Sequence, residues 1–274
     1  GAMIEFPEHS PFADMPKPTA DRRFMAMPAY LGGKYRMAGV KWYGSNVANR
    51  DQGLPRSILM MTLNDADTGA PVAHMSANIL SAYRTGAVPG VGARWLARAD
   101  SHTVGILGPG VMARTALLAF VAACPQIDLV KVKGRSAAGV VDFSEWVGQN
   151  LPNLRVETVE SVEEVVRNSD IVTYCTTAAT TPDGYPELRR EWLRPGAYVS
   201  LPSCAKVDEA MYGDGVRKVV DHLGLYEAWA EEFPYPTYAE IPIIGCEFTD
   251  RVHEGRLRLD EIEDLGALLA SDRP

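Results

Sequence analysis

The sequence contains few cysteines, no excess of basic residues and no long apolar run, and each of these absences excludes a class of protein. Its four cysteines are Cys124, Cys175, Cys204 and Cys246. They are widely spaced and form neither a C-x-x-C pair nor a cluster with histidine. A disulfide framework and a metal site are therefore not expected, and reduced thiols in the cytoplasm are the default.

The charge and length narrow the class of protein further. A net charge of −8, without any Lys/Arg-rich run, argues against a nucleic-acid partner. No apolar run approaches the roughly 20 residues needed to cross a bilayer, so no membrane partner is expected. The hydrophobic content of 46% and the 274 residues are those of a soluble globular protein of one or two domains.

The stretch from His102 to Ala123 carries the clearest motif of the chain. A short apolar run, Thr103 to Leu107, predicts a strand; a glycine-rich turn and an apolar helical pattern follow it. The turn reads G-x-G-x-x-A, as in a dinucleotide-binding crossover, although glycines also serve in purely structural turns. The first glycine permits a tight turn, and the second lets the backbone approach a pyrophosphate at the helix N-terminus. The residues predicted to bind the cofactor here are Gly108, Pro109, Gly110, Val111 and Met112.

After this motif, strand and helix patterns alternate. Further strands are predicted at residues 129–133, 155–158, 171–175, 198–201 and 216–220. A helix is expected at 137–149, with Val140, Val141 and Val147 inward, and another is capped by Ser161 with Glu164 at the capping-box position. Six strands joined by crossover helices predict an α/β fold with a doubly wound parallel sheet covered on both faces.

The residues before the motif predict a smaller α+β domain. Five prolines in the first 30 residues exclude a long helix and indicate extended, wrapping chain. Strand patterns at 36–42, 57–64 and 72–75 indicate an antiparallel meander. A helix follows at 77–97, kinked or broken at Pro89-Gly90, with one face formed by Ile79, Ala82, Tyr83 and Ala87. The predicted domains are residues 1–96 and 97–274.

In a doubly wound sheet, ligands lie beyond the carboxyl ends of the strands. The second strand ends in Gly134, Arg135 and Ser136, and no carboxylate follows before Asp142. NAD selection needs a carboxylate at this strand end for the ribose hydroxyls, whereas an arginine and a serine suit a 2′-phosphate. NADP is therefore favoured over NAD. The alternative is an arginine that merely covers the adenine ring.

The fourth and fifth strand ends supply further candidates for cofactor binding. Thr176 and Thr177 follow the fourth strand, where they could contact the nicotinamide or simply serve as loop donors. Leu201 and Ser203 follow the fifth. Outside this domain, Lys41 in GVKWYGSN and Arg84 in SAYRTGA are notable cations. On spacing alone, each is better explained as a solvated surface residue.

An ordered set of motifs resembles a known family across nearly the whole chain. These motifs are MPAYLGG at Met27 to Gly33, then GVKW, GLPRS at Gly53 to Ser57, LNDADTGAPVA at Leu63 to Ala73, SAYRTGAV at Ser81 to Val88, and GILGPGVMAR at Gly105 to Arg114. Together they resemble the ornithine cyclodeaminase/mu-crystallin family. The run GLYEAWAEE at Gly224 to Glu232 resembles a subgroup of that family that is named after tyramine oxidase.

The resemblance implies roles that the residue patterns alone do not. In that family, the residues matching Lys41 and Arg84 hold the substrate carboxylate against the nicotinamide, so these two become the expected catalytic residues. It also implies a Rossmann-type domain and a substrate platform that forms a homodimer through its sheet. The implied substrate is an amino acid or its imine.

Two departures from the family pattern change the expected chemistry. Cyclodeaminases carry an Asp shortly after the fifth strand, whereas this chain has Ser200 to Cys204 there and no carboxylate before Asp208. Because a hydroxyl of very high pKa cannot replace a carboxylate base, an amino-acid dehydrogenase or imine reductase is favoured. The alternatives are ornithine or lysine cyclodeamination and a non-catalytic cofactor-binding protein. The second departure is length: segments before Ile4 and after Pro274 are expected to be missing, which would weaken dimerisation.

Overall fold

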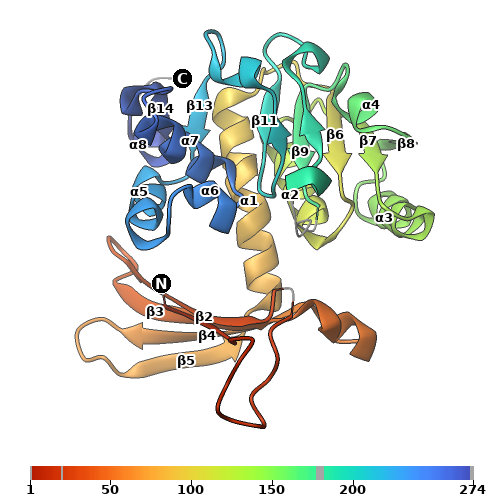
Figure 1. Cartoon of the computed structure of the whole chain (residues 1–274). Coiled ribbons are helices and arrows are strands. Elements are labelled where there is room, and N and C mark those ends of the chain that lie inside the picture. The colour runs from red at the N-terminus through yellow and green to blue at the C-terminus, as the bar shows by residue number, and fades with distance from the viewer. Residues whose placement is uncertain (1, 20, 177–181, 272–274) are drawn as a thin grey trace. The chain divides into compact units, whose positions relative to one another are not determined.

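A computed structural model describes residues 2–19, 21–176 and 182–271, and it divides the chain into two compact units. The first unit is Gly1–Tyr83 and the second is Arg84–Pro274 (Figure 1). Helix α1 (Asn78–Leu96) runs across this boundary. The boundary expected from the sequence, at residue 96, coincides with the end of that helix.

The first unit contains a five-stranded antiparallel sheet in which each strand pairs with the next along the chain. Its strands are β1 (Ala2–Glu5), β2 (Arg23–Leu31), β3 (Met37–Ser45), β4 (Ser57–Asp65) and β5 (Pro71–Ser76). A short 3₁₀ helix, η1 (Val47–Gln52), joins β3 to β4. The predicted three-stranded meander is therefore confirmed as β3, β4 and β5, and two further strands precede it.

The first 30 residues are extended and form no helix where they are described, as expected, but they do not merely wrap around the domain. Part of this stretch forms β1 and β2, which belong to the sheet. The prolines do not exclude these strands, because β1 pairs with β2 only from Arg23 to Ala26. Pro28 lies beyond that, where β2 is an edge of the described sheet, and proline is tolerated in edge strands.

The second unit is organised around a five-stranded parallel sheet of order β11-β9-β6-β7-β8. The strands are β6 (Thr103–Leu107), β7 (Leu129–Lys133), β8 (Arg155–Thr158), β9 (Ile171–Tyr174) and β11 (Tyr198–Ser200). Chain order therefore reverses at β6, as in a Rossmann-type doubly wound sheet. The predicted fold class is confirmed.

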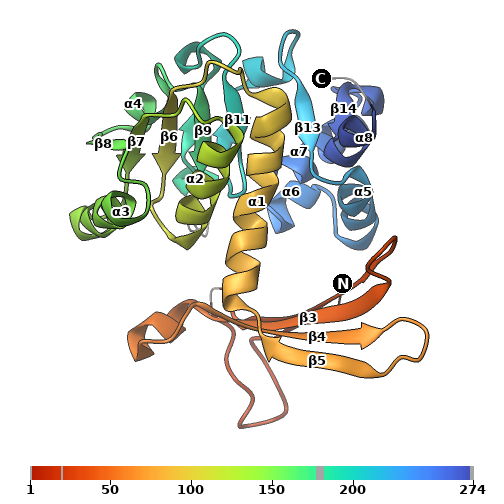
Figure 2. The same ribbon diagram turned by 180° about the vertical axis from the view of Figure 1, so that it is seen from behind.

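Helices cover both faces of this sheet. On one face, α1, α2 (Val111–Ala123) and α3 (Ala137–Asn150) pack on the buried strand residues, as Figure 2 shows. On the other, α4 (Val162–Val166) packs with residues that follow β9 and β11. In α3, Val140 and Val147 face inward as expected, but Val141 is 55% exposed and Phe143 takes the inward place.

The helix predicted at 77–97 is confirmed as α1, which continues through Pro89; of the predicted kink or break there, the break is absent. Its buried face consists of small residues that permit close packing within the second unit. A Cβ on Gly90 would lie 2.3 Å from the Cβ of Ala119 in α2, and the carbonyl of Pro89 accepts a hydrogen bond from the hydroxyl of Tyr198 at 3.1 Å. The face that carries Ile79 and Tyr83 is exposed instead.

The predicted sixth strand forms but does not join the main sheet. Strand β13 (Lys218–Val220) pairs in parallel with β14 (Ile262–Asp264). A short apolar run predicts a strand without specifying its partner, and this partner comes much later in the chain. The intervening and following helices are α5 (Leu223–Glu232), α6 (Thr237–Glu240), α7 (Ile244–His253) and α8 (Leu265–Ala270), which build a separate C-terminal core. Among the described helices, none is long and apolar enough to cross a membrane.

Candidate functional site

The glycine-rich loop between β6 and α2 has the backbone that its sequence predicts. Gly108 has a φ of 89°, in the left-handed region that favours glycine. A Cβ at this position would lie 2.8 Å from the carbonyl carbon of Cys175, at the end of β9. Both the backbone conformation and the available space therefore require glycine at this position. The ends of β6 and β9 are held side by side here.

The N-terminus of α2 is open to a ligand. Gly110 is its N-cap and supplies no capping side chain. A Cβ built on Gly110 would meet nothing within 4 Å, and the neighbouring Val111 is 64% exposed. The first-turn N–H groups and the positive end of the helix dipole thus face accessible space, which is the arrangement that binds a phosphate.

The loop after β7 lies against this glycine loop. A Cβ on Gly134 would be 3.1 Å from Cγ of Pro109 and 2.8 Å from Cγ2 of Val140. Arg135 is exposed, and Ser136 is the N-cap of α3, where its hydroxyl accepts from the N–H of Gly139 at 3.3 Å. The hydroxyl proton of Ser136 remains available to donate to a ligand.

The first carboxylate after β7 is engaged elsewhere. Asp142 lies in the second turn of α3 and pairs with the guanidinium of Arg114 in α2 at 2.5 Å. That guanidinium also stands over the ring of Trp146 at 5.5 Å. Because Asp142 is paired with Arg114, the charged side chain in the loop between β7 and α3 is that of Arg135. No pattern in the sequence indicated the Arg114–Asp142 pair.

Two hydroxyls connect the ends of β9 and β11. Ser203 donates to the carbonyl of Tyr174 at 2.7 Å, and its oxygen lies 3.3 Å from Oγ1 of Thr176. Leu201 is half-buried and packs against the core on the face of the sheet that α4 covers. Of the residues predicted here, only Thr177 lies outside the described residues.

The thiol nearest the glycine loop has no properties of a nucleophile. Cys175 is buried, and burial raises the pKa of its thiol to about 11. The thiolate is the reactive form of cysteine, so Cys175 stays protonated at neutral pH. In the described part of the chain, no three His, Cys, Asp or Glu residues converge as a metal site would require.

The two cations predicted to bind substrate belong to different units. Lys41 lies in the middle of β3, half-buried, with its ammonium 5.2 Å from the ring centre of Tyr43. Arg84 lies in α1 and is exposed. Each is placed within its own unit, and the role of both remains a prediction.

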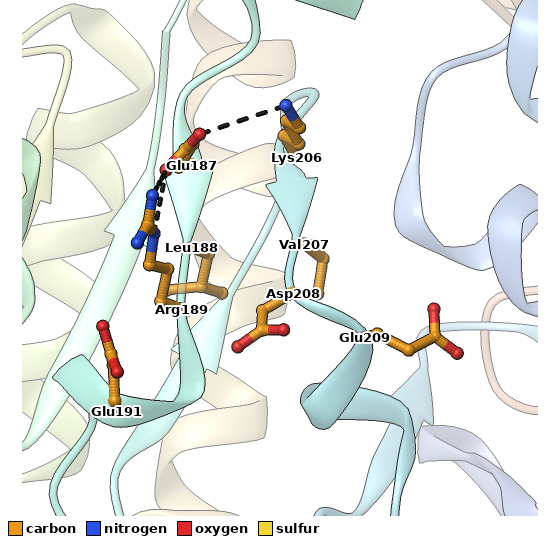
Figure 3. A pocket seen from close by; sticks show the side chains of 8 residues that line it. All are labelled: Glu187, Leu188, Arg189, Glu191, Lys206, Val207, Asp208 and Glu209. Carbon is orange, nitrogen blue, oxygen red and sulfur yellow. Dashed lines mark hydrogen bonds and ion pairs between the residues drawn. The ribbon is translucent and has the colours of Figure 1, made fainter.

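A polar pocket lies apart from these residues. It is formed around β10 (Glu187–Leu188) and β12 (Lys206–Val207), and none of the predicted site residues lines it (Figure 3). Within the pocket, Glu187 contacts Arg189 at 2.7 Å and Lys206 at 4.0 Å, whereas Glu209 pairs with Arg251 and Arg256 outside the lining. Because none of the residues predicted to bind cofactor or substrate lines this pocket, we assign it no catalytic role.

Comparisons with known proteins agree with this fold. An N-((2S)-2-amino-2-carboxyethyl)-L-glutamate dehydrogenase of Staphylococcus aureus is 28% identical over 73% of this chain and 58% of its own length. An alanine dehydrogenase of Archaeoglobus fulgidus is 34% identical over 64% of this chain and 50% of its own length. The chain thus spans about half to three fifths of these curated relatives.

A solved structure matches over almost all of the chain. It is the Δ1-pyrroline-2-carboxylate reductase of Thermococcus litoralis in complex with NADH and L-proline. The identity is 27% and the TM-score 0.74, with 98% of this chain and 74% of that chain covered. The model of the ornithine cyclodeaminase/mu-crystallin family matches residues 2–237. The chain belongs to the ornithine cyclodeaminase/mu-crystallin family.

Proposed function

We propose that this protein is an NADP(H)-dependent oxidoreductase that acts on an amino acid or its imine, as an amino-acid dehydrogenase or imine reductase. The observation that carries the proposal is the glycine loop, with Gly108 held against the end of β9 and the N-terminus of α2 left open. The likeness to a reductase solved with NADH and L-proline supports the same chemistry.

The residues around the loop fit a nicotinamide dinucleotide. Gly108 to Met112 would hold the pyrophosphate, and Gly134, Arg135 and Ser136 the adenosine end. Thr176, Leu201 and Ser203, with Thr177 beside them in sequence, would border the nicotinamide. When bound, the cofactor supplies or accepts a hydride at carbon.

The preference for NADP rests on this chain's own residues, because the Thermococcus enzyme was solved with NADH. The exposed Arg135 has the planar donor set that matches a phosphate, and the hydroxyl of Ser136 adds a donor. Asp142, the first carboxylate after β7, is paired with Arg114. Nothing at this strand end therefore selects for the ribose hydroxyls of NAD.

For the substrate, we assign the carboxylate to Lys41 and Arg84. Two charge-assisted contacts fix both the charge and the orientation of a carboxylate. The half-buried position of Lys41, in the middle of a strand, suits this role because a rigid strand positions a side chain precisely enough for catalysis.

Hydride transfer also fits the residues after β11. The segment from Ser200 to Cys204 offers hydroxyls and a thiol but no carboxylate. A protonated imine takes a hydride at carbon and leaves as an amine, so this step needs no protein acid. Cyclodeamination, in contrast, needs a base near the substrate amine, which a hydroxyl does not provide.

Turnover distinguishes this proposal from its alternatives. The protein is incubated with NADPH, ammonium or methylamine, and a set of 2-oxo acids, while oxidation of NADPH and formation of amino acid are both followed. We expect one NADPH oxidised for each amino acid formed. Ammonia released from ornithine without net change in the cofactor would instead identify a cyclodeaminase. NADPH binding without either reaction would identify a binding protein.

We propose that the protein forms a homodimer through one face of its antiparallel sheet. Phe24, Trp42 and Ile58 lie on the same face and are 38%, 40% and 45% exposed. The rings of Phe24 and Trp42 stack with their centres 5.8 Å apart. A two-fold axis would cover this apolar face with its own copy. We also propose a cytoplasmic location, because the four cysteines are free.

A further inference from the structure

The face of the sheet that carries Lys41 is lined with methionine. In the register of strands β2 to β5, Met27 lies opposite Lys41, Lys41 opposite Met61, and Met61 opposite Met75. Directly opposite residues share a face, with their Cβ atoms about 5 Å apart. A single ammonium therefore stands in a row of three methionines that crosses four strands. All four residues are half-buried.

The rows on either side continue this apolar lining. On one side of the row of Lys41, at a distance of two residues along each strand, the next row consists of Met25, Tyr43 and Leu59. The hydroxyl of Tyr43 reaches the sulfur of Met25 at 3.5 Å, which confirms that these side chains share the face. In the other direction, the next row consists of Ala29, Gly39, Leu63 and Ala73.

The nearest acidic groups on this face are distant or engaged. Within the described strands β2 to β5, the row of Lys41 and the two rows beside it contain no carboxylate. In β4, Asp65 is four residues from Met61, and in the other direction Glu5 of β1 lies in the row of Arg23, four residues from Met27. Each row is about 13 Å from the row of Lys41 at the rise of a strand. The carboxylate of Asp65 accepts from the N–H of Thr68 in the following turn. Asp21 is held by Arg23 and Arg56.

From this arrangement we infer that the substrate carries an apolar side chain, and that amino acids with a cationic side chain are rejected. The inference rests on the proposed function, since it takes Lys41 as the ligand of the substrate carboxylate. An apolar chain lying over the methionine row is buried, and methionine adapts its shape to it. A second ammonium there would lose water, meet no carboxylate in these three rows of the described strands and be repelled by Lys41.

Two matched pairs of amino acids test this inference. Norvaline and ornithine, and likewise norleucine and lysine, differ by the terminal ammonium that the second member carries. Oxidation of each by NADP+ gives kcat/KM, and calorimetry on the NADP+-loaded protein gives Kd without turnover. We expect norvaline and norleucine to be preferred by at least about 30-fold in both measurements, as for an unpaired charge brought out of water.

A variant of the methionine row sharpens the test. In Met61→Glu, the new carboxylate should raise kcat/KM for ornithine relative to norvaline by about tenfold or more. Met61→Gln, which has the same shape without the charge, should not. Cooperative unfolding and circular dichroism show whether each variant folds, and the comparison in the unmodified protein stands if one does not.

The outcomes separate this inference from the proposed function. Equal or better use of ornithine would overturn the apolar substrate class and leave the oxidoreductase standing. Failure of all four amino acids to bind or react, with NADPH still bound, would overturn both. A preference for norvaline that falls by about tenfold or more in Met61→Glu and is kept in Met61→Gln supports the inference.

Discussion

At the scale of single residues, the choice of cofactor is assigned to Arg135, which stands exposed at the end of β7. We expect Arg135→Ala to weaken NADPH binding by about 1.5–3 kcal/mol, the range for a charge-assisted hydrogen bond. NADH, which lacks the phosphate, should bind nearly as before, and it serves as the control in the same titration. Equal losses for both cofactors would show that Arg135 does not contact the phosphate.

The proposed substrate ligands, Lys41 and Arg84, are tested by a second pair of substitutions. Lys41→Ala and Arg84→Ala should each abolish turnover while NADPH affinity stays within a few-fold, because a carboxylate without its cations loses both attraction and orientation. Lys34→Ala, which removes an exposed lysine of the first unit, is the matched control and should leave the rate unchanged. Normal kinetics in both test variants would return Lys41 and Arg84 to the class of surface charges.

Single residues were predictable where their role is local. The conformation of Gly108 and the cap of α4 follow from a few neighbours: Ser161 accepts from the N–H of Glu164 at 3.1 Å, as its capping-box spacing indicates. The Arg114–Asp142 pair was missed because its partners are 28 residues apart and meet only when α2 and α3 pack.

At the scale of elements, the packing of α1 on α2 depends on glycine. Gly90→Ala would place a methyl group 2.3 Å from Cβ of Ala119, so we expect a loss of about 1–3 kcal/mol in the free energy of unfolding. Gly148→Ala in α3 is the control, since nothing lies within 4 Å of that position. It should gain about 0.5–1 kcal/mol from helix propensity. Urea unfolding measures both, and an unchanged Gly90→Ala variant would contradict the close packing.

The existence of elements was more predictable than their pairing. The strands of the parallel sheet follow from apolar runs and were placed within a residue or two. The pairing of β13 with β14 could not be predicted, because three helices separate the two strands in the sequence. The helix at 77–97 was predicted with a kink or break at Pro89-Gly90. Its unbroken course through Pro89 was not predictable, since the glycines that fit α1 against α2 act only in the folded packing.

At the scale of the whole molecule, the exposed apolar face of the first unit predicts self-association. We expect a concentration-dependent homodimer in sedimentation, and Trp42→Glu should shift it to monomer by placing a charge in the interface. Val141→Glu is the control, because Val141 is exposed on α3 in the second unit. A well-behaved monomer at every concentration in the unmodified protein would show that the sheet is not a dimer interface.

The proposed reaction assigns the cofactor to residues of the second unit and the substrate carboxylate to Lys41 of the first and Arg84 of the second. The most direct test follows the hydride itself. NADPH carrying deuterium at the transferred position is supplied with ammonium and 2-oxopentanoate, and the amino acid formed is analysed by mass spectrometry. We predict one deuterium at carbon 2 of norvaline for each NADPH oxidised. Product without deuterium, or bound NADPH that is never oxidised, would contradict hydride transfer to the substrate carbon.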